Sequence, residues 1–351
     1  MTNTQLKIAL LDVQDEAKWD AFVDADKNAT PYHKTAWMRA VKDAYGFEPK
    51  AIAAWQSEEL VGVLPLVVMS SPFGGKSACS LPYCDAGGIL ATSDEVYQAI
   101  QTHVIAMAKS AGWKTTELRF ANSEIKDDVE QVAKVRMLLD LPDTSELLMA
   151  SFKSKLRSQI RKAEKNGLTA SLGTDAKHLD GFYQVYSRNM RDLGSPAHSF
   201  DWFKSVINAF GDQAMIACVY FEEQVVGGGL IIRTKDRVSI PWASTNADFN
   251  RLAPNMLLYW TLLEHVNDSG AKMFDFGRST PGEGTFKFKK QWGAQPAPLD
   301  WQKLEGDDFV SFGNVKSAPS STRQKVEMLW RKLPVGLATF VGSNVRKYIS
   351  L

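Results

Sequence analysis

Two stretches of the chain share one pattern, AAWQSEELVGVLPLVV at residues 53–68 and CVYFEEQVVGGGLIIR at residues 218–233. In each stretch an apolar run, a short acidic turn and a second apolar run predict two strands joined by a turn. A second pair follows in the same order, SAGWKTTEL at 110–118 and DSGAKMFDF at 268–276. A repeat on this scale indicates duplicated domains rather than a solenoid, whose units are much shorter.

The elements around these stretches repeat as well. In the first half we expect strands at 50–55, 60–69, 77–82 and 113–120, with a helix at 94–110. In the second half we expect strands at 214–221, 225–233, 238–243 and 272–276, with a helix at 254–268. Three strands, a helix and a strand form the core of the acetyltransferase fold. We therefore predict an α/β (α+β) protein with two tandem GNAT (acyl-CoA N-acyltransferase-like) domains, each a mixed sheet flanked by helices. The alternative is one large α/β domain whose halves are similar by accident.

The length of 351 residues suits two domains of ordinary size. We place an N-terminal GNAT-like domain at 1–148 and a C-terminal one at 149–310. The segment SAPSSTRQ predicts a linker, so residues 311–351 are expected to form a linker and an amphipathic tail. The tail has an apolar face with basic residues at both ends. Packing on its own domain is the first interpretation, and weak membrane contact through residues 322–351 is the alternative.

Composition excludes several classes of function. A formal net charge of +1 provides no global field that would recruit nucleic acid, so no DNA partner is expected. Three cysteines without a CxxC pair and five histidines without an HExxH pair indicate neither a disulfide framework nor a metal site. Because no signal peptide or membrane-spanning stretch is evident, we expect a cytoplasmic protein. Peripheral location at the inner face of the membrane is the alternative.

A basic segment lies between the two halves, SFKSKLRSQIRKAEKNGLTA at residues 151–170. We expect a helix over 151–168, on which Arg157, Arg161 and Lys165 share one face through their i, i+4 spacing. Such a one-sided stripe is typical of a site that binds a phosphate-bearing substrate. An ordinary solvated helix face is an equally good interpretation.

The densest group of chemically active residues is FDFGRSTPGEGTFKFKKQWGAQPAPLDW at 274–301. Asp275 ends a predicted strand, and a glycine-rich loop follows that lets the backbone approach a ligand closely. The alternating lysines and phenylalanines predict a further strand, with Lys287 and Lys289 on one face and Phe286 and Phe288 on the other. The alternative is an edge strand whose lysines face solvent and prevent pairing with another chain.

The strings DFGRS and GTFKFKKQWGAQP in this region resemble the FemAB proteins, which transfer aminoacyl groups in cell-wall synthesis. The likeness extends to the FemAB-like branch associated with exosortase (PEP-CTERM) exopolysaccharide systems. It spans about residues 30–301 and includes HKTAWMRAVKDAYGFEP (33–49), LPLVVMSSPFGGKSACSLPYCDAGGIL (64–90), KLRSQIRKAEKNGL (155–168), MRDLGSPAHS (190–199) and APNMLLYW (253–260).

The resemblance implies an acyltransferase. In the cell-wall enzymes the donor is aminoacyl-tRNA and the acceptor is a nucleotide- or lipid-linked sugar peptide. The lysine of their FK-xx-(F/W)G motif supports the reacting carbonyl, which makes Lys289 the first candidate catalytic residue. Asp275 is the candidate to accept the proton of the nucleophile. The candidate substrate-binding residues are Arg278, Ser279, Arg157, Arg161, Asn255, Tyr259, Trp242 and Phe288.

One departure leaves the donor open. The segment STNADFNRLAPN (244–255) has none of the glycines with which acetyltransferases that use coenzyme A usually bind pyrophosphate. We expect no tightly bound cofactor, and acyl-CoA or aminoacyl-tRNA as co-substrate, with tRNA a partner in the second case. The predicted function is transfer of an acyl or aminoacyl group to an amine or hydroxyl of a phosphate-linked cell-envelope or exopolysaccharide precursor. The alternatives are an aminoacyl-tRNA-dependent transferase of the peptidoglycan type and a non-catalytic GNAT-fold binding scaffold.

Overall fold

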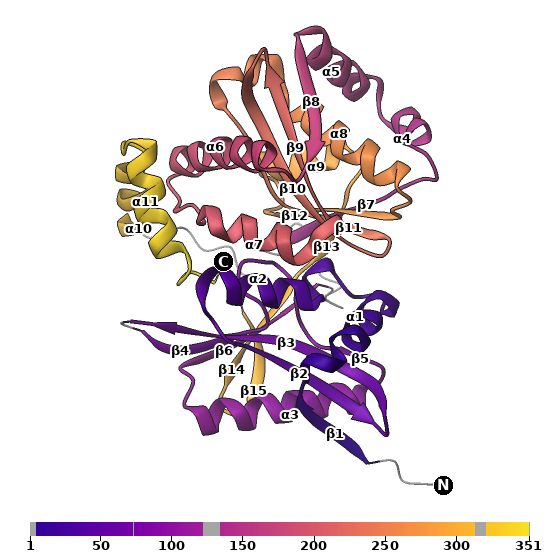
Figure 1. The fold of residues 1–351 in the computed structure, drawn as a ribbon, viewed down its shortest axis with the longest axis vertical. Helices are drawn as coiled ribbons and strands as arrows, with labels where there is room; N and C mark the ends of the chain where they lie inside the picture. Colours follow the sequence, from indigo (N-terminus) through magenta and orange to yellow (C-terminus); the bar gives the residue numbers. More distant parts are fainter. Residues whose placement is uncertain (1–4, 73, 122–133, 313–320, 351) are drawn as a thin grey trace. The chain divides into compact units, whose positions relative to one another are not determined.

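The computed structural model describes residues 5–72, 74–121, 134–312 and 321–350, with side chains from residue 323 onward in the last range. The chain divides into two compact units. Each unit contains a mixed sheet flanked by helices (Figure 1), so the predicted fold class is confirmed. The first unit comprises Met1–Arg136, Ala297–Lys316 and Tyr348–Leu351, and the second comprises Met137–Pro296 and Ser317–Lys347.

These units differ from the predicted domain boundaries, 1–148 and 149–310. The chain enters the second unit within β7 (Val135–Asp140) and later returns to the first, because β14 (Asp300–Glu305) pairs with β6 (Thr115–Phe120). Of the predicted linker SAPSSTRQ, residues 317–320 lie outside the described residues. Residues 321–324 begin helix α10 instead, which belongs to the second unit together with the tail as far as Lys347.

The sheet of the first unit has the strand order β1-β2-β3-β4-β6-β14-β15, with β5 beside β3. All neighbours are antiparallel except β4 and β6, which run parallel. The strands not yet delimited are β1 (Leu6–Leu10), β2 (Pro49–Gln56), β3 (Glu59–Ser71), β4 (Gly75–Cys79), β5 (Leu90–Ala91) and β15 (Asp308–Phe312). The helices are α1 (Glu16–Ala25), α2 (Thr35–Tyr45) and α3 (Asp94–Ala111).

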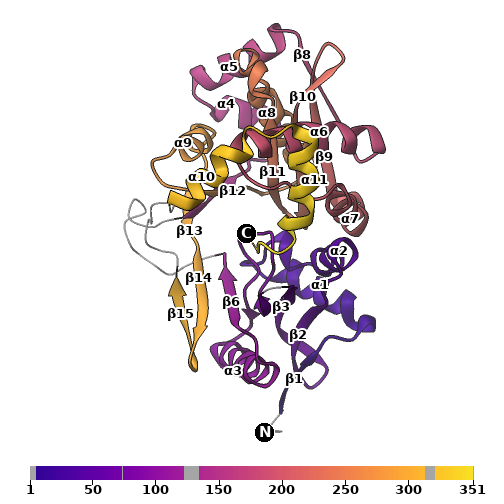
Figure 2. The ribbon, with the colours of Figure 1, turned by 90° about the vertical axis from the view of Figure 1, so that its left-hand side faces the viewer.

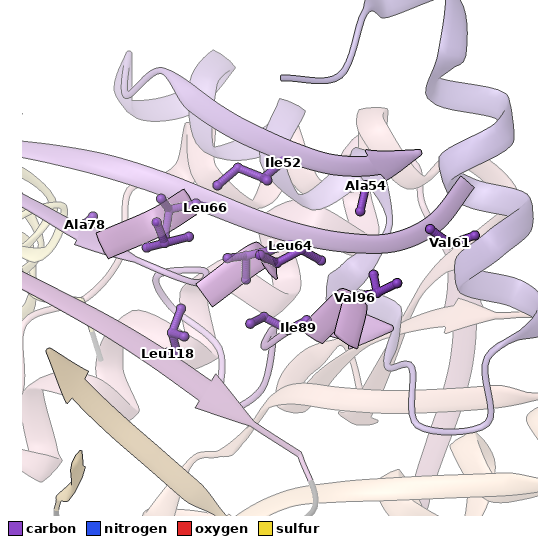
Figure 3. Packing of buried hydrophobic residues seen from close by; sticks show 11 residues of the cluster. Ile52, Ala54, Val61, Leu64, Leu66, Ala78, Ile89, Val96 and Leu118 are labelled. Atoms are coloured by element: carbon purple, nitrogen blue, oxygen red, sulfur yellow. The ribbon is translucent and has the colours of Figure 1, made fainter. Parts of the chain in front are cut away.

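Helix α3 packs on one face of this sheet. The hydroxyl of Ser93 caps its first turn by accepting from the amide of Val96, and Gly112 ends it in the left-handed conformation. Val96 and Ile100 pack with apolar side chains of β2, β3 and β6 to form the core (Figure 3). The contact is so close that a Cβ at Gly62 would lie 2.6 Å from Val96.

The three cysteines contribute to the interior of the two units. Cys79, Cys84 and Cys218 are all buried and free. Burial raises the pKa of Cys79 and of Cys218 to about 11. Both thiols therefore stay protonated near neutral pH, which makes them poor nucleophiles.

The sheet of the second unit has the order β13-β7-β12-β11-β10-β9-β8. Its further strands are β8 (Leu168–Gly173), β9 (Ala214–Phe221), β10 (Gln224–Thr234), β11 (Arg237–Thr245), β12 (Met273–Ser279) and β13 (Gln295–Pro298). The helices are α4 (Ser145–Ser151), α5 (Ser154–Lys165), α6 (Ala176–Leu193), α7 (Phe200–Phe210), α8 (Pro254–Asp268), α9 (Gly284–Gln291), α10 (Ser321–Trp330) and α11 (Val335–Arg346).

The three glycines of β10 explain how closely helices approach this sheet. A Cβ at Gly228 would lie 3.1 Å from the Cα of Phe182 in α6, whereas one at Gly229 would lie 3.2 Å from Leu262 in α8. Because successive residues of a strand point to opposite faces, α6 and α8 cover opposite faces of the sheet.

Candidate active site

Two parallel strands of the second sheet separate part-way along their length. The pairing of β11 with β12 ends at Ser239 opposite Asp275, although β11 continues to Thr245 and β12 to Ser279. Beyond that pair, no further residues of β11 and β12 are paired in the described part of the chain, although a Cβ at Gly277 would still lie 3.7 Å from the carbonyl oxygen of Ile240. Buried main-chain N–H and C=O groups are almost always hydrogen-bonded, so a ligand that supplies partners can bind at this separation.

Two buried hydroxyl groups flank the separation. Ser239 is 1% exposed and Ser279 is 4% exposed, and neither Oγ has a hydrogen-bond partner within the described residues. An unsatisfied buried hydroxyl costs about 1–3 kcal/mol, so such groups are rare unless a ligand or water satisfies them. Ser279 was a predicted binding residue. Ser239 was not, because an isolated serine in a strand has no distinguishing sequence pattern.

Asp275 lies at the last paired position of β12. It is 4% exposed, and its Oδ1 accepts a hydrogen bond of 2.8 Å from the amide of Gly277. Gly277 has φ +73°, which a residue with a side chain rarely adopts. The left-handed conformation at this glycine accompanies the hydrogen bond from its amide that holds the Asp275 carboxylate.

Lys289 extends from α9 to the same end of β12. Its side chain is buried, and its Nζ donates to the carbonyl oxygens of Gly277 at 3.1 Å and of Arg278 at 2.8 Å. Two successive carbonyls of a regular strand point in opposite directions, so the left-handed conformation of Gly277 is what lets both reach one ammonium group. The structure thus brings together Lys289, Asp275, Arg278 and Ser279, four of the predicted residues.

The predicted strand at 286–289 is wrong, because Gly284–Gln291 forms helix α9. An alternating Phe-Lys pattern of four residues is compatible with either a strand or a turn of helix, and here it forms a helix. Phe288 and Trp292 are four residues apart and contact each other on one side of the helix, with ring centroids 6.2 Å apart. Lys289 points instead toward β12, and Lys287 is exposed.

Tyr259 and Phe288 pack beside Lys289 in an aromatic cluster. The ring of Tyr259 stacks on Phe276 at 5.5 Å and meets Phe288 edge-on at 5.1 Å. Burial raises the pKa of Tyr259, so its hydroxyl stays protonated near neutral pH. These two predicted binding residues position α9 against β12. Asn255, in the first turn of α8, is half-buried.

Trp242 packs in another aromatic cluster. Its ring lies 4.9 Å from Phe203, 6.1 Å from Trp202 and 6.1 Å from His198. Phe203 and Trp202 belong to α7. The structure therefore places this predicted binding residue against α7 rather than in the aromatic cluster around Lys289.

The cluster around Trp242 predicts a pH-dependent stability. Burial, with a smaller contribution from the Arg346 cation, holds the pKa of His198 well below its ordinary value of 6.5. Below about pH 6.5 the unfolded chain binds a proton that the folded protein does not, so stability is full above that pH and falls below it. Urea unfolding at pH 7 and pH 5 should show this loss, with a slope of at most about 1.4 kcal/mol per pH unit.

The variant His198→Phe isolates this contribution. It keeps an aromatic ring beside Trp202, whose ring stacks on that of His198 at 5.6 Å. We expect a smaller loss of stability between pH 7 and pH 5 in the variant. An identical loss in both proteins would contradict the assignment.

Arg157 and Arg161 line a pocket of about 440 Å³ in the second unit. The helix predicted over 151–168 is shorter, because the buried Phe152 ends the preceding α4 in an extended conformation, α5 spans Ser154–Lys165 and β8 begins at Leu168. The Nη1 of Arg157 donates to the carbonyl of Ala150 at 3.2 Å, which directs this side chain along α4. The remaining residues around the pocket come from α4 and α8: Ser145, Glu146, Met149, Ala150, Trp260 and Glu264.

Two residues of this pocket were missed by the sequence analysis. Trp260 and Glu264 lie one turn apart on α8, in a mostly apolar sequence that gave no sign of a binding role. Burial raises the pKa of Glu264, and the negative charges of Asp268, Glu164 and Glu146 raise it further. The ring of Phe152 lies 6.1 Å from Trp260 and 5.5 Å from Trp292, so packed aromatic rings connect the pocket with α9.

Comparison with known proteins agrees with this fold. Residues 150–290 match the acetyltransferase (GNAT) domain family. That range includes α5, the separation of β11 and β12, and Lys289. The domain match identifies an acyltransferase of the GNAT type, as the sequence predicted. No curated protein sequence matches the chain.

Three solved structures illustrate the fold. FemX is 15% identical with a TM-score of 0.66, and the match covers 83% of this chain and 95% of FemX. A tandem GNAT protein from the clavulanic acid biosynthesis pathway is 12% identical, with a TM-score of 0.53 and coverages of 86% and 98%. The C-terminal domain of a putative lysylphosphatidylglycerol synthetase from Agrobacterium fabrum is 12% identical, with a TM-score of 0.54 and coverages of 82% and 91%. Together with the domain match, these similarities support a FemAB-like GNAT family.

Proposed function

We propose that the protein transfers an acyl or aminoacyl group to an amine or hydroxyl of a phosphate-linked cell-envelope or exopolysaccharide precursor. The observation that carries this proposal is the position of Lys289, whose buried ammonium bonds to the carbonyls of Gly277 and Arg278, two and three residues along β12 from the buried Asp275. Acyl transfer needs positive charge where an oxyanion develops and a proton acceptor near the nucleophile. This end of β12 provides both.

The donor proposed is an acyl thioester of the coenzyme A type, as in other GNAT acyltransferases. The nitrogen or oxygen of the acceptor attacks the thioester carbonyl, a C–N or C–O bond forms, and the C–S bond breaks. Lys289 stabilises the negative charge on the carbonyl oxygen during this step. Asp275 accepts the proton that the nucleophile loses, and that proton passes to the departing thiolate.

The acceptor's phosphate is assigned to the pocket beside α5. Arg157 is half-buried and Arg161 is exposed, and both face the same cavity as the indole of Trp260. A guanidinium binds phosphate oxygens through paired N–H groups, and an indole provides an apolar surface for a sugar or base. This recognition agrees with the resemblance of 155–168 to the FemAB-like branch associated with exosortase systems.

Removing both arginines should weaken binding of a phosphate-bearing acceptor. We expect Arg157→Ala combined with Arg161→Ala to raise the Kd for a UDP-sugar probe at least about tenfold, because two charge-assisted hydrogen bonds are lost. Isothermal titration at low and high salt measures this change. The difference between variant and unmodified protein should shrink as salt increases.

The matched control is Lys153→Ala combined with Lys155→Ala. Both lysines are exposed and belong to the same basic segment, but neither lines the pocket. Equal weakening by the two double variants, or a Kd that responds to neither variant nor salt, would show that the stripe is a solvated surface.

The function is tested by mass spectrometry of ligands that co-purify with the native protein, followed by transfer assays. Radiolabelled acyl-CoA and aminoacyl-tRNA are offered separately with the co-purified acceptor. Transfer from acyl-CoA supports the proposal, whereas transfer from aminoacyl-tRNA alone would replace the donor class. Absence of both bound acceptor and transfer would favour the non-catalytic scaffold.

A further inference from the structure

The two C-terminal helices pack on the second unit through small residues. Helix α11 contacts α6, and its buried positions are Ala338 and Gly342 (Figure 2). A Cβ at Gly342 would lie 2.8 Å from the amide nitrogen of Ala197, so the helix backbone approaches its support closely. Surface helices usually turn their large apolar residues inward. Helix α11 turns its smallest residues inward instead.

The large apolar side chains of α11 consequently face outward. Phe340 is 70% exposed, Leu337 is 49% exposed and Val345 is 44% exposed. On a helix of 3.6 residues per turn Leu337 and Phe340 lie on the side away from Gly342, whereas Val345 lies nearer the buried side, in the last turn. Helix α10 has the same character, since Leu329 is 67% exposed and Met328 is 56% exposed. We call these residues, with Val326, Lys325 and Lys332, the C-terminal patch.

The patch gathers much of the exposed apolar surface of the described residues. Of thirteen large hydrophobic side chains that are at least 38% exposed in the described part of the chain, six belong to these two helices. Single exposed hydrophobic residues need no explanation, whereas a group of this size on two adjoining helices marks an interaction surface.

The charge around the patch identifies the kind of partner. Residues 321–351 contain six lysines and arginines and one acidic residue, Glu327, in a chain whose net charge is +1. Glu327 is paired with Arg323 at 2.8 Å. Lys325 and Lys332 are exposed, and their side-chain ammonium groups have no hydrogen-bond or ion-pair partner within the described residues. Large apolar side chains next to unpaired cations are typical of segments that bind an anionic lipid surface.

We propose that the C-terminal patch docks on an anionic lipid bilayer, with Phe340, Leu337 and Leu329 entering the boundary between headgroups and acyl chains. Lys325 and Lys332 then contact lipid phosphates. No helix in the described part of the chain is long and apolar enough to cross a bilayer, so this contact is peripheral. A second copy of this protein is a less suitable partner for the C-terminal patch, because contact between two patches would bring their basic residues together. The proposal goes beyond the transfer reaction and does not depend on it.

Co-sedimentation of the full chain with vesicles tests the proposal. We expect binding to vesicles of phosphatidylglycerol and phosphatidylcholine, and little binding to phosphatidylcholine alone. Leu337→Ser combined with Phe340→Ser should lower the partition coefficient at least about tenfold, because two large apolar groups no longer leave water. Lys325→Glu combined with Lys332→Glu should lower it by a similar factor and provides a second test if the first variant folds poorly.

The matched controls lie elsewhere on the chain. Val13→Ser combined with Val310→Ser replaces two exposed hydrophobic residues outside the patch, and Lys27→Glu combined with Lys204→Glu changes the same net charge. Both controls should bind vesicles as the unmodified protein does. Equal loss in the controls, or equal binding to neutral and anionic vesicles, would overturn the proposal. The proposal would also be overturned if the unmodified protein did not bind vesicles and light scattering showed that it is a dimer, which the Leu337→Ser and Phe340→Ser variant dissociates.

Discussion

Replacing Lys289 by alanine should lower kcat for acyl transfer at least about tenfold while the protein remains folded. The physical reason is the loss of a preorganised positive charge where the carbonyl oxygen becomes negative. The charge is effective because the side chain is 8% exposed and is held by the carbonyls of Gly277 and Arg278. Steady-state kinetics with the identified donor and acceptor measure the change, and KM should change less than kcat.

The alanine variant also removes the donor to those two carbonyls, so a structural effect has to be separated from a chemical one. We expect a loss of about 1–3 kcal/mol in the free energy of unfolding, which urea denaturation measures. Lys287→Ala is the matched control, because this exposed lysine lies in the same helix. Its kcat and stability should both be unchanged. Full activity in Lys289→Ala would end the assignment of Lys289.

Replacing Arg119 by alanine should destabilise the first unit by about 3–5 kcal/mol, the cost of breaking a buried ion pair and its hydrogen bonds. Arg119 is 2% exposed and pairs with Glu117 at 3.0 Å. Its guanidinium also donates to the carbonyls of Leu81, Cys84 and Ser350. Alanine would leave these buried acceptors without their donor.

Urea unfolding followed by tryptophan fluorescence measures this effect, since Trp301 lies 5.2 Å from the Arg119 guanidinium. Arg39→Ala is the control, because Arg39 forms an exposed ion pair with Glu16 and its removal should cost about 1 kcal/mol or less. A loss below about 1 kcal/mol in Arg119→Ala would refute the role assigned to this residue.

The repeated part of the fold was predictable because it depends on local patterns. Helix α8 begins and ends at the predicted residues, and β9 and β10 lie within one residue of their predicted bounds. The division of the chain between units was not predictable in the same way. It depends on the pairing of Trp301 with Arg119, two residues distant in sequence whose contact no local pattern reveals.

The candidate site was predicted where its residues are close in sequence. Asp275 and Ser279 lie in one strand, and the helix containing Lys289 follows after a short loop. Ser239 and Glu264 were missed because only the folded sheet places Ser239 opposite Asp275, and only the packing of α8 places Glu264 in the pocket with Arg157. The strand at 286–289 was mispredicted for a different reason, because an alternating pattern of four residues cannot distinguish a strand from one turn of helix.

A structure of the protein with a non-hydrolysable ketone analogue of acyl-CoA tests the central claim most directly. We predict that the analogue's carbonyl oxygen lies between β11 and β12, about 2.7–3.1 Å from the Nζ of Lys289. The hydroxyls of Ser239 and Ser279 should then have partners. An analogue bound away from this separation, with the Nζ of Lys289 still donating to the carbonyls of Gly277 and Arg278 and not to the analogue, would contradict the account.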